Sequence, residues 1–231
     1  MDKKADIIAI IPARGGSRGI PRKNLAQLNG RPLIYYTIIE AGKSNYLDRI
    51  FVSTDDGEIA AVAREYRAEV IERPVELGRD DTPSFLVYQH VIRYVEEHEG
   101  LHPGIIVILQ PTSPLRIRED IDGALDQFLE SDHDTVVSVC AAEHPPHWMY
   151  TLDGDKMKLL IPSGDRVLRR QDAPAVYRVN GAVYVIRRDV IMKEGRILGT
   201  DTRAYIMPPE RSVDIDNELD LKLAGLLMKE G

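Results

Sequence analysis

The chain has 231 residues, of which 43% are hydrophobic and 29% charged, and its net charge is -7. Length and composition predict one soluble α/β domain with a sizeable core. The negative charge argues against a general nucleic-acid or anionic-membrane binder, because such proteins rely on a positive surface. A single cysteine, Cys140, rules out a disulfide within the chain, and no apolar run is long enough to span a membrane. The first residues do not resemble a signal peptide, so we expect a cytoplasmic protein.

Strands and helices alternate along the first part of the chain. Short apolar runs predict buried strands, and apolar residues three and four positions apart predict helices between them. The expected strands are 7–11, 49–54, 69–72, 105–109 and 135–141. The expected helices are 33–44, 58–66, 84–97 and 119–130. This alternation predicts right-handed βαβ units and therefore an α/β fold with a mostly parallel, Rossmann-like sheet.

The alternation breaks at about residue 142. A proline-rich stretch and then short alternating patterns around an Asp-Gly turn predict a small β-rich element at 142–175. The α/β pattern resumes with expected strands at 182–186 and 202–206, followed by a last helix. We therefore expect a single domain, 1–231, that carries one insertion.

The most unusual stretch follows the first strand and reads PARGGSRGIPRKN, residues 12–24. It contains three glycines and four cations. Glycines let backbone N–H groups approach a ligand, consecutive amides bind anions, and cations at the end of a strand complete a polyphosphate site. Arg14 and Lys23 are the cations best placed for phosphate, whereas Arg18 and Arg22 are less certain. The loop matches neither the P-loop nor the GxGxxG pattern, and the alternative is a solvated basic loop.

Two further polar loops follow predicted strands, at 53–56 and 110–116. The carboxyl ends of parallel strands meet at one edge of a sheet, and ligands bind outside that edge. The glycine-rich loop falls at the same edge. The agreement of three unusual loops predicts a ligand site there.

Asp214 and Asp216 flank one apolar residue in a segment expected to be extended, so both carboxylates point to one face. Two carboxylates held together repel unless a cation or a proton lies between them. Mg²⁺ suits such a pair, together with phosphate oxygens of a substrate. The alternative is a cluster of acids at the start of the last helix. Arg169 and Arg170 suit a substrate carboxylate, or else belong to a solvated charged face.

Taken together, these segments resemble the acylneuraminate cytidylyltransferases, also called CMP-sialic acid synthetases. The resemblance covers nearly the whole chain, and the matching segments occur in the same order. They are IPARGGSRGIPRKN at 11–24, STDD at 53–56, ERP at 72–74, QPTSPLR at 110–116, RRQD at 169–172, YRVNGAVY at 177–184 and DIDNELDL at 214–221. One departure is Arg18, where lysine is usual, and it keeps the charge.

The resemblance implies a nucleotide-diphospho-sugar transferase fold in which 142–175 is a dimerisation element. It also implies a reaction: with Mg²⁺, CMP is transferred from CTP to the anomeric hydroxyl of a nine-carbon 2-keto sugar acid such as N-acetylneuraminate, and pyrophosphate is released. The enzyme would act as a homodimer, with Arg169 or Arg170 serving the neighbouring active site in trans.

The resemblance also assigns roles to individual residues. The nucleotide and its phosphates are held by Arg14, Gly15, Gly16, Ser17, Lys23 and Asn24. Arg73 and Thr82 are placed for the cytosine, and Asp214 and Asp216 hold Mg²⁺. The catalytic groups are Arg14, Lys23, Asp214 and Asp216. The sugar pocket is lined by Gln110, Arg169, Arg170, Gln171, Asn180 and Tyr184.

Three groups of alternatives stay open. Within the same enzyme class, the sugar could be legionaminic, pseudaminic or Kdo acid, and Kdo is disfavoured because the RRQD and NGA segments look sialate-like. A dinucleotide-dependent (NAD-type) oxidoreductase would need a tighter glycine turn that leads directly into a helix. A non-catalytic nucleotide-binding module would not need Lys23 together with Asp214 and Asp216. Release of pyrophosphate from CTP and a sugar acid separates the first group from the other two.

Overall fold

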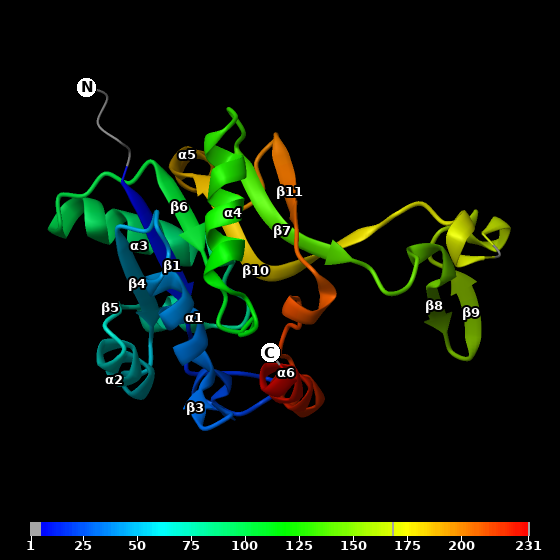
Figure 1. The fold of residues 1–231 in the computed structure, drawn as a ribbon, viewed down its shortest axis with the longest axis horizontal. Coiled ribbons are helices and arrows are strands. Elements are labelled where there is room, and N and C mark those ends of the chain that lie inside the picture. The colour runs from blue at the N-terminus through cyan, green and yellow to red at the C-terminus, as the bar shows by residue number, and fades with distance from the viewer. Residues whose placement is uncertain (1–5, 168, 231) are drawn as a thin grey trace.

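A computed structural model describes residues 6–167 and 169–230, and its centre is a seven-stranded sheet with helices on both faces (Figure 1). The strand order is β11-β7-β10-β6-β1-β4-β5. The strands are β1 (Ile7–Pro12), β4 (Arg49–Thr54), β5 (Glu69–Glu72), β6 (Ile105–Ile108), β7 (Thr135–Ala141), β10 (Tyr177–Arg187) and β11 (Thr202–Ile206). All neighbouring strands are parallel except for β10, which runs antiparallel to β6 and β7. The predicted mostly parallel α/β fold is confirmed.

The sheet is buried on both faces, as the apolar runs predict. In β1, the side chains of Ile7, Ala9 and Ile11 pack into one core, whereas Ile8 and Ile10 pack into another. The first core lies under α1 (Leu33–Gly42), α2 (Gly57–Glu65) and α4 (Arg118–Leu129). The second lies under α3 (Ser84–His98) and α5 (Arg188–Glu194). Burial on both sides leaves the carboxyl edge of the sheet as the place where loops can build a site.

The last helix, α6 (Glu218–Glu230), packs near the start of the chain. Ala224 lies in a small core with Leu28, which belongs to β2 (Gln27–Leu28), the partner strand of β3 (Arg31–Pro32). This packing brings the segment before α6 to the end of the glycine-rich loop. Residues near the two ends of the sequence therefore meet in one site.

Between β7 and β10 the chain leaves the sheet as an arm, residues 142–175, that projects away from the rest of the molecule (Figure 1). The arm carries a hairpin of β8 (Tyr150–Asp153) and β9 (Lys156–Leu159). Its apolar side chains are open to solvent, with Leu152 69% and Met157 63% exposed. Two-stranded hairpins are marginally stable alone in water, and exposed apolar surface of this kind is typical of interaction sites. In the described part of the chain, no helix is both long and apolar enough to cross a membrane.

Candidate active site

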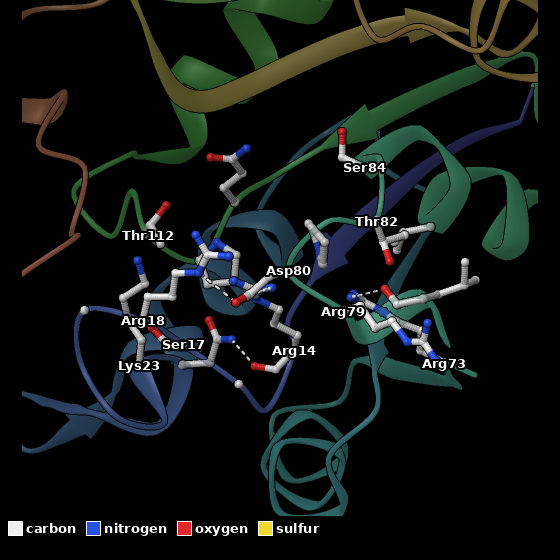
Figure 2. Close-up of a pocket in the computed structure, with 18 of the residues that line it drawn as sticks. Arg14, Ser17, Arg18, Lys23, Arg73, Arg79, Asp80, Thr82, Ser84 and Thr112 are labelled. Atoms are coloured by element: carbon white, nitrogen blue, oxygen red, sulfur yellow. Dashed lines mark hydrogen bonds and ion pairs between the residues drawn. The ribbon is translucent and has the colours of Figure 1, made fainter. Parts of the chain in front are cut away.

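A cavity of about 490 Å³ opens at the carboxyl edge of the sheet. Its walls come from the glycine-rich loop after β1, the loop between β5 and α3 with the first turns of α3, the start of the loop after β6, and Asp216 before α6. Figure 2 shows Ser17, Arg18 and Lys23 at one end of the cavity and Arg73 and Thr82 at the other. The cavity thus has a cationic end and a second end that is lined by the buried guanidinium of Arg73 and the hydroxyl of Thr82.

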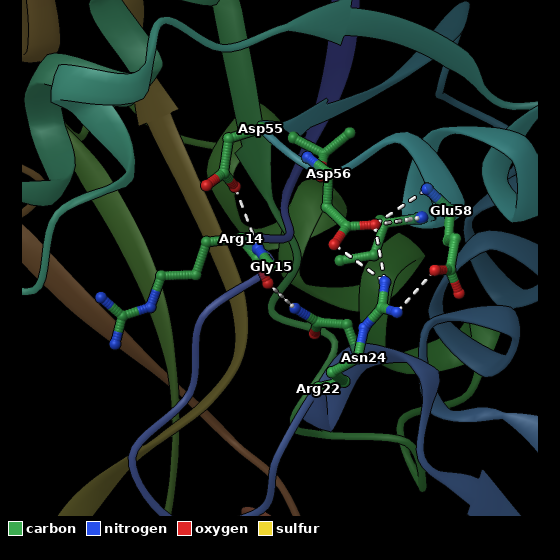
Figure 3. A network of polar contacts seen from close by, with 9 residues as sticks. Arg14, Gly15, Arg22, Asn24, Asp55, Asp56 and Glu58 are labelled. Atoms are coloured by element: carbon green, nitrogen blue, oxygen red, sulfur yellow. Dashed lines mark hydrogen bonds and ion pairs between the residues drawn. The ribbon is translucent and has the colours of Figure 1, made fainter.

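The glycine-rich loop is held in shape by polar contacts at its rear (Figure 3). The Gly15 amide donates to Asp55 Oδ1 at 2.9 Å, and Asn24 Nδ2 donates to the Arg14 carbonyl at 2.9 Å. The Arg22 guanidinium donates to the carboxylates of Asp56 and Glu58. Arg22 therefore ties the loop to the start of α2, whereas Arg14 points the other way. Because its amide is already engaged by Asp55, Gly15 shapes the loop, and it does not line the cavity.

Lys23 joins the loop to residues 214–216, called the acidic segment below, and its contact with Ile215 spans 192 positions of the chain. Its Nζ donates to the Ile215 carbonyl at 2.7 Å and forms an ion pair with Asp216 at 3.0 Å. Its side chain is only 16% exposed, and it lines the cavity. An ammonium has three donors, so one remains for a ligand in the cavity.

Gly19 marks the closest approach between the same two segments. A Cβ built on Gly19 would lie 2.0 Å from the Asp216 carbonyl oxygen. Only glycine fits at this point, because backbone atoms of Asp216 cannot move aside as the end of a flexible side chain would. The loop and the acidic segment therefore form one packed unit.

Gly19→Ala is expected to push the loop away from the acidic segment. Turnover in the cytidylyl transfer expected from the sequence should fall about a hundredfold, since small displacements of catalytic groups have effects of that size. Steady-state rates of the purified variant check this. Gly42→Ala is the matched control, because a Cβ there meets nothing within 4 Å. A Gly19→Ala enzyme as active as Gly42→Ala would show that the close contact is unimportant.

Asp214 and Asp216 lie on the extended segment before α6, with Ile215 fully buried between them. The Ile215 amide donates to the Thr112 carbonyl at 2.8 Å, which fastens the segment to the loop after β6. Asp214 Oδ1 is buried without a hydrogen-bond partner. Burial raises the pKa of this carboxyl, a hydrogen bond with Thr112 opposes the rise, and the charge of Asp216 adds to it. The Asp216 side chain is 76% exposed and reaches the cavity.

This pair fits a hard divalent cation. A divalent cation would give the buried carboxylate oxygen a partner and would neutralise the repulsion between the two carboxylates. The described residues contain no group of three or more His, Cys, Asp or Glu side chains that could hold a metal. Two carboxylates alone are the kind of donor set that Mg²⁺ uses when phosphate oxygens and water complete its shell.

The other end of the cavity is built by the loop between β5 and α3. Arg73 is 7% exposed, and its Nη2 donates to the Ser53 carbonyl at 2.8 Å. The Thr82 hydroxyl donates to the Glu76 carbonyl at 2.9 Å. Leu77, Val87 and Tyr88 add apolar surface beside these polar groups. A flat heterocycle that needs both apolar contact and hydrogen bonds suits such a wall.

The chain matches the family model described as cytidylyltransferase over residues 8–217. The chain belongs to the cytidylyltransferase family. This cytidylyltransferase is 32% identical to a CMP-N,N'-diacetyllegionaminic acid synthase of Campylobacter jejuni, over 97% of this chain and 95% of that protein. It is 34% identical to an N-acylneuraminate cytidylyltransferase of Escherichia coli, over 96% of this chain and 52% of that protein, so it spans about half of that relative.

Its fold is that of solved enzymes with little sequence similarity. A structure of CMP:2-keto-3-deoxy-manno-octonic acid synthetase complexed with CTP superposes with a TM-score of 0.74 at 17% identity, covering 98% of this chain and 99% of that one. A 4-diphosphocytidyl-2C-methyl-D-erythritol synthase from Anaerococcus prevotii superposes with a TM-score of 0.67 at 13% identity, covering 97% of this chain and 96% of that one. Both likenesses support the fold alone.

Of the residues expected at the sugar, Gln110 lines the cavity, whereas Asn180 does not. Asn180 is fully buried; its Nδ2 donates to Ser212 Oγ at 2.9 Å, and its Oδ1 accepts from Ser138 Oγ at 2.6 Å. The amide of Asn180 is thus engaged by side chains inside the protein, and its place at the sugar stays a prediction. Tyr184 is 7% exposed in the core beside α3, and burial raises its pKa.

Arg169, Arg170 and Gln171 lie on the arm and do not line this cavity. Arg169 forms an ion pair with Asp172 at 2.8 Å, and Arg170 borders a separate hollow at the base of the arm. The structure therefore brings most of the nucleotide candidates and Asp216 to one cavity, whereas Asp214 lines a neighbouring hollow that Asp216 also borders. It does not bring the arm residues to them.

Sequence reasoning missed two residues, one that supports the loop after β6 and one that lines the cavity. Arg116 is 1% exposed, and it donates to the Ala182 carbonyl at 2.7 Å and to Thr37 Oγ1 at 2.6 Å, so it holds the loop after β6 against the sheet. Burial lowers the pKa of Arg116 to about 10. Asp80 lies in the cavity beside the arginines of the glycine-rich loop. In the sequence, Arg116 is only the last letter of QPTSPLR, and Asp80 belongs to an irregular charged loop.

Proposed function

We propose that this cytidylyltransferase transfers CMP from CTP to the anomeric hydroxyl of a nine-carbon 2-keto sugar acid and releases pyrophosphate. The observation that carries the proposal is the contact of Lys23 with the acidic segment at the cationic end of the cavity. It joins the glycine-rich loop to the segment that carries both Asp214 and Asp216, and this supports a site for phosphates and a metal ion. Relatives named for activating sialic, legionaminic and pseudaminic acids support the class of acceptor.

The cationic end would hold the triphosphate. Gly16, Ser17 and Lys23 line it, and their donors suit phosphate oxygens. Phosphoryl transfer depends mainly on positioning and on stabilisation of charge, so donors next to the leaving pyrophosphate contribute most as the bond breaks. Arg14 and Lys23 would steady that charge. Arg73 and Thr82 would place the cytosine at the other end.

Mg²⁺ would be held by Asp214 and Asp216. When bound, the ion neutralises phosphate charge and lowers the pKa of a nearby hydroxyl. Asp214 Oδ1, buried without a protein partner, is the atom most in need of such a ligand. The Thr112 carbonyl keeps the segment in place through the Ile215 amide.

The homodimer also remains a proposal. The arm has exposed apolar side chains, including Leu152 and Met157, on a hairpin with little core of its own. A second copy of the chain would cover them, and its own arm would reach back by the two-fold symmetry of a dimer. Arg169 or Arg170 would then meet the substrate carboxylate in the partner's cavity.

Mixing two inactive variants tests the trans arrangement. Lys23→Ala impairs the cavity and Arg170→Ala impairs the arm. In a random mixture about half of the dimers are heterodimers, and one of the two sites in each has both residues intact, so about a quarter of wild-type activity should return. Each variant alone is the control. If co-expression restores nothing, Arg170 does not act across subunits.

A panel of sugar acids tests the proposed reaction. Pyrophosphate release is measured with CTP and sialic, legionaminic, pseudaminic or Kdo acid, and kcat/KM is compared. The highest value is expected with a nine-carbon acid. A highest value with Kdo would overturn the acceptor, and a highest value with GTP or UTP in place of CTP would overturn the nucleotide. The cytoplasmic location expected from the sequence stays a prediction.

A further inference from the structure

The cationic end of the cavity already contains an anion from the protein itself. Arg14 Nη1 lies 2.5 Å from Asp80 Oδ1, and Arg18 Nε lies 2.7 Å from Asp80 Oδ2. Each carboxylate oxygen thus has one guanidinium, and the three side chains lie together at the cationic end (Figure 2). Asp80 comes from the loop between β5 and α3, so the two ion pairs bridge the opposite walls of the cavity.

The Asp80 loop is held by contacts that do not involve these ion pairs. The Thr82 hydroxyl donates to the Glu76 carbonyl at 2.9 Å, and the Leu77 amide donates to the Pro74 carbonyl at 2.9 Å. The Asp80 carboxylate can therefore leave the arginines without unfolding its own loop.

The ion pairs are also open to exchange. The Asp80 side chain is 43% exposed and that of Arg18 is 79% exposed. The Arg18 guanidinium holds the pKa of Asp80 below its usual range, with Arg14 adding to the effect, so the carboxylate is an anion at neutral pH. Exposed ion pairs are weak enough for a ligand of higher charge to replace them.

We propose that Asp80 is an internal competitor for the phosphate-binding arginines. In the empty enzyme it occupies Arg14 and Arg18; a triphosphate displaces it, and it returns as pyrophosphate leaves. A polyphosphate brings several anionic oxygens that fit guanidinium groups better than one carboxylate does. Asp80 thereby weakens the binding of pyrophosphate and favours its release. The inference rests on the proposed function, which assigns these arginines to the phosphates.

The consequence for binding follows from simple competition. When only a fraction of the enzyme has free arginines, the apparent dissociation constant of a phosphate ligand rises by the inverse of that fraction. An exposed ion pair changes an equilibrium by a factor of about two to five. Removal of the Asp80 charge is therefore expected to tighten pyrophosphate binding about fivefold.

Calorimetric titration with inorganic pyrophosphate tests the proposal on the intact protein. Asp80→Asn should bind pyrophosphate about fivefold more tightly than the wild type. Asp81→Asn is the matched control, because it removes the same charge from the next, exposed position, and it should change the affinity less than twofold. Cytidine, which has no phosphate, should bind equally to all three proteins.

Three outcomes would overturn the proposal. Weaker or unchanged pyrophosphate binding by Asp80→Asn would mean that Asp80 orients the arginines rather than competing for them. An equal gain in Asp81→Asn would assign the effect to net charge, and an equal gain for cytidine would assign it to the base pocket. Failure of the cytidylyl reaction itself is separate, because it appears in the sugar-acid panel while pyrophosphate binding reports on Asp80 alone.

Discussion

Asp214→Asn is expected to lower turnover about a thousandfold and at the same time to stabilise the protein. The loss follows because a divalent ion stabilises transition-state charge by several kcal/mol, and Asp214 has the carboxylate oxygen most available to it. The gain follows because a partly buried charge without a partner for Oδ1 destabilises the fold. Since the group is partly solvated, we expect about 1 kcal/mol, or about 3 °C in Tm. Initial rates and thermal unfolding measure the two effects.

Asp216→Asn is the matched comparison for this variant. Its side chain is 76% exposed and already paired with Lys23, so its loss should reduce activity without raising Tm. Added Mg²⁺ should raise the Tm of the wild type and leave that of Asp214→Asn unchanged. Full turnover of Asp214→Asn at saturating Mg²⁺ would show that this residue does not hold the ion.

Lys23→Ala is expected to lower kcat by about a hundredfold to a thousandfold while KM for the sugar acid changes less than threefold. The loss of one donor to developing charge has effects of this size. The structure adds a second reason, because the same ammonium holds the Ile215 carbonyl and Asp216 in place. Steady-state kinetics with each substrate varied in turn separate the two parameters.

Lys43→Ala serves as the control for Lys23→Ala, since Lys43 is an exposed lysine paired with Glu40 at the end of α1. It should leave kcat unchanged. A Lys23→Ala enzyme with near-normal kcat and only a raised KM for CTP would reduce Lys23 to a ground-state contact. It would not act on the departing pyrophosphate.

Most of the sheet could be predicted because its signal is local. The expected strands 49–54, 69–72 and 202–206 coincide with β4, β5 and β11. Short runs of apolar and β-branched residues between turn signals suffice, because this pattern marks a strand whichever strands it pairs with. The strand expected at 182–186 is longer in the structure, where β10 begins at Tyr177. Its first residues pair with the end of β7, and this pairing depends on the path of the arm.

The contacts that sequence reasoning missed have a different cause. Asn180 resembles a sugar ligand by motif, but a register shift in β10 directs its amide to Ser138 and Ser212 inside the protein. Arg116 donates to the Ala182 carbonyl and to Thr37 Oγ1, and Asp80 forms an ion pair with Arg14 across the cavity. These contacts of Arg116 and Asp80 join residues more than sixty positions apart, and no local pattern encodes them.

The sequence by itself determined the order of strands and helices, the edge of the sheet at which the cavity opens, and the types of residue gathered there. It did so because periodicity, glycine and charge act over a few residues. Only the tertiary structure decided that Gly19 packs against Asp216, that Lys23 connects the loop to the acidic segment, and that Asp80 forms ion pairs with Arg14 and Arg18. Each of these depends on distances set by the packing of α6 and of the β5–α3 loop, which are properties of the whole fold.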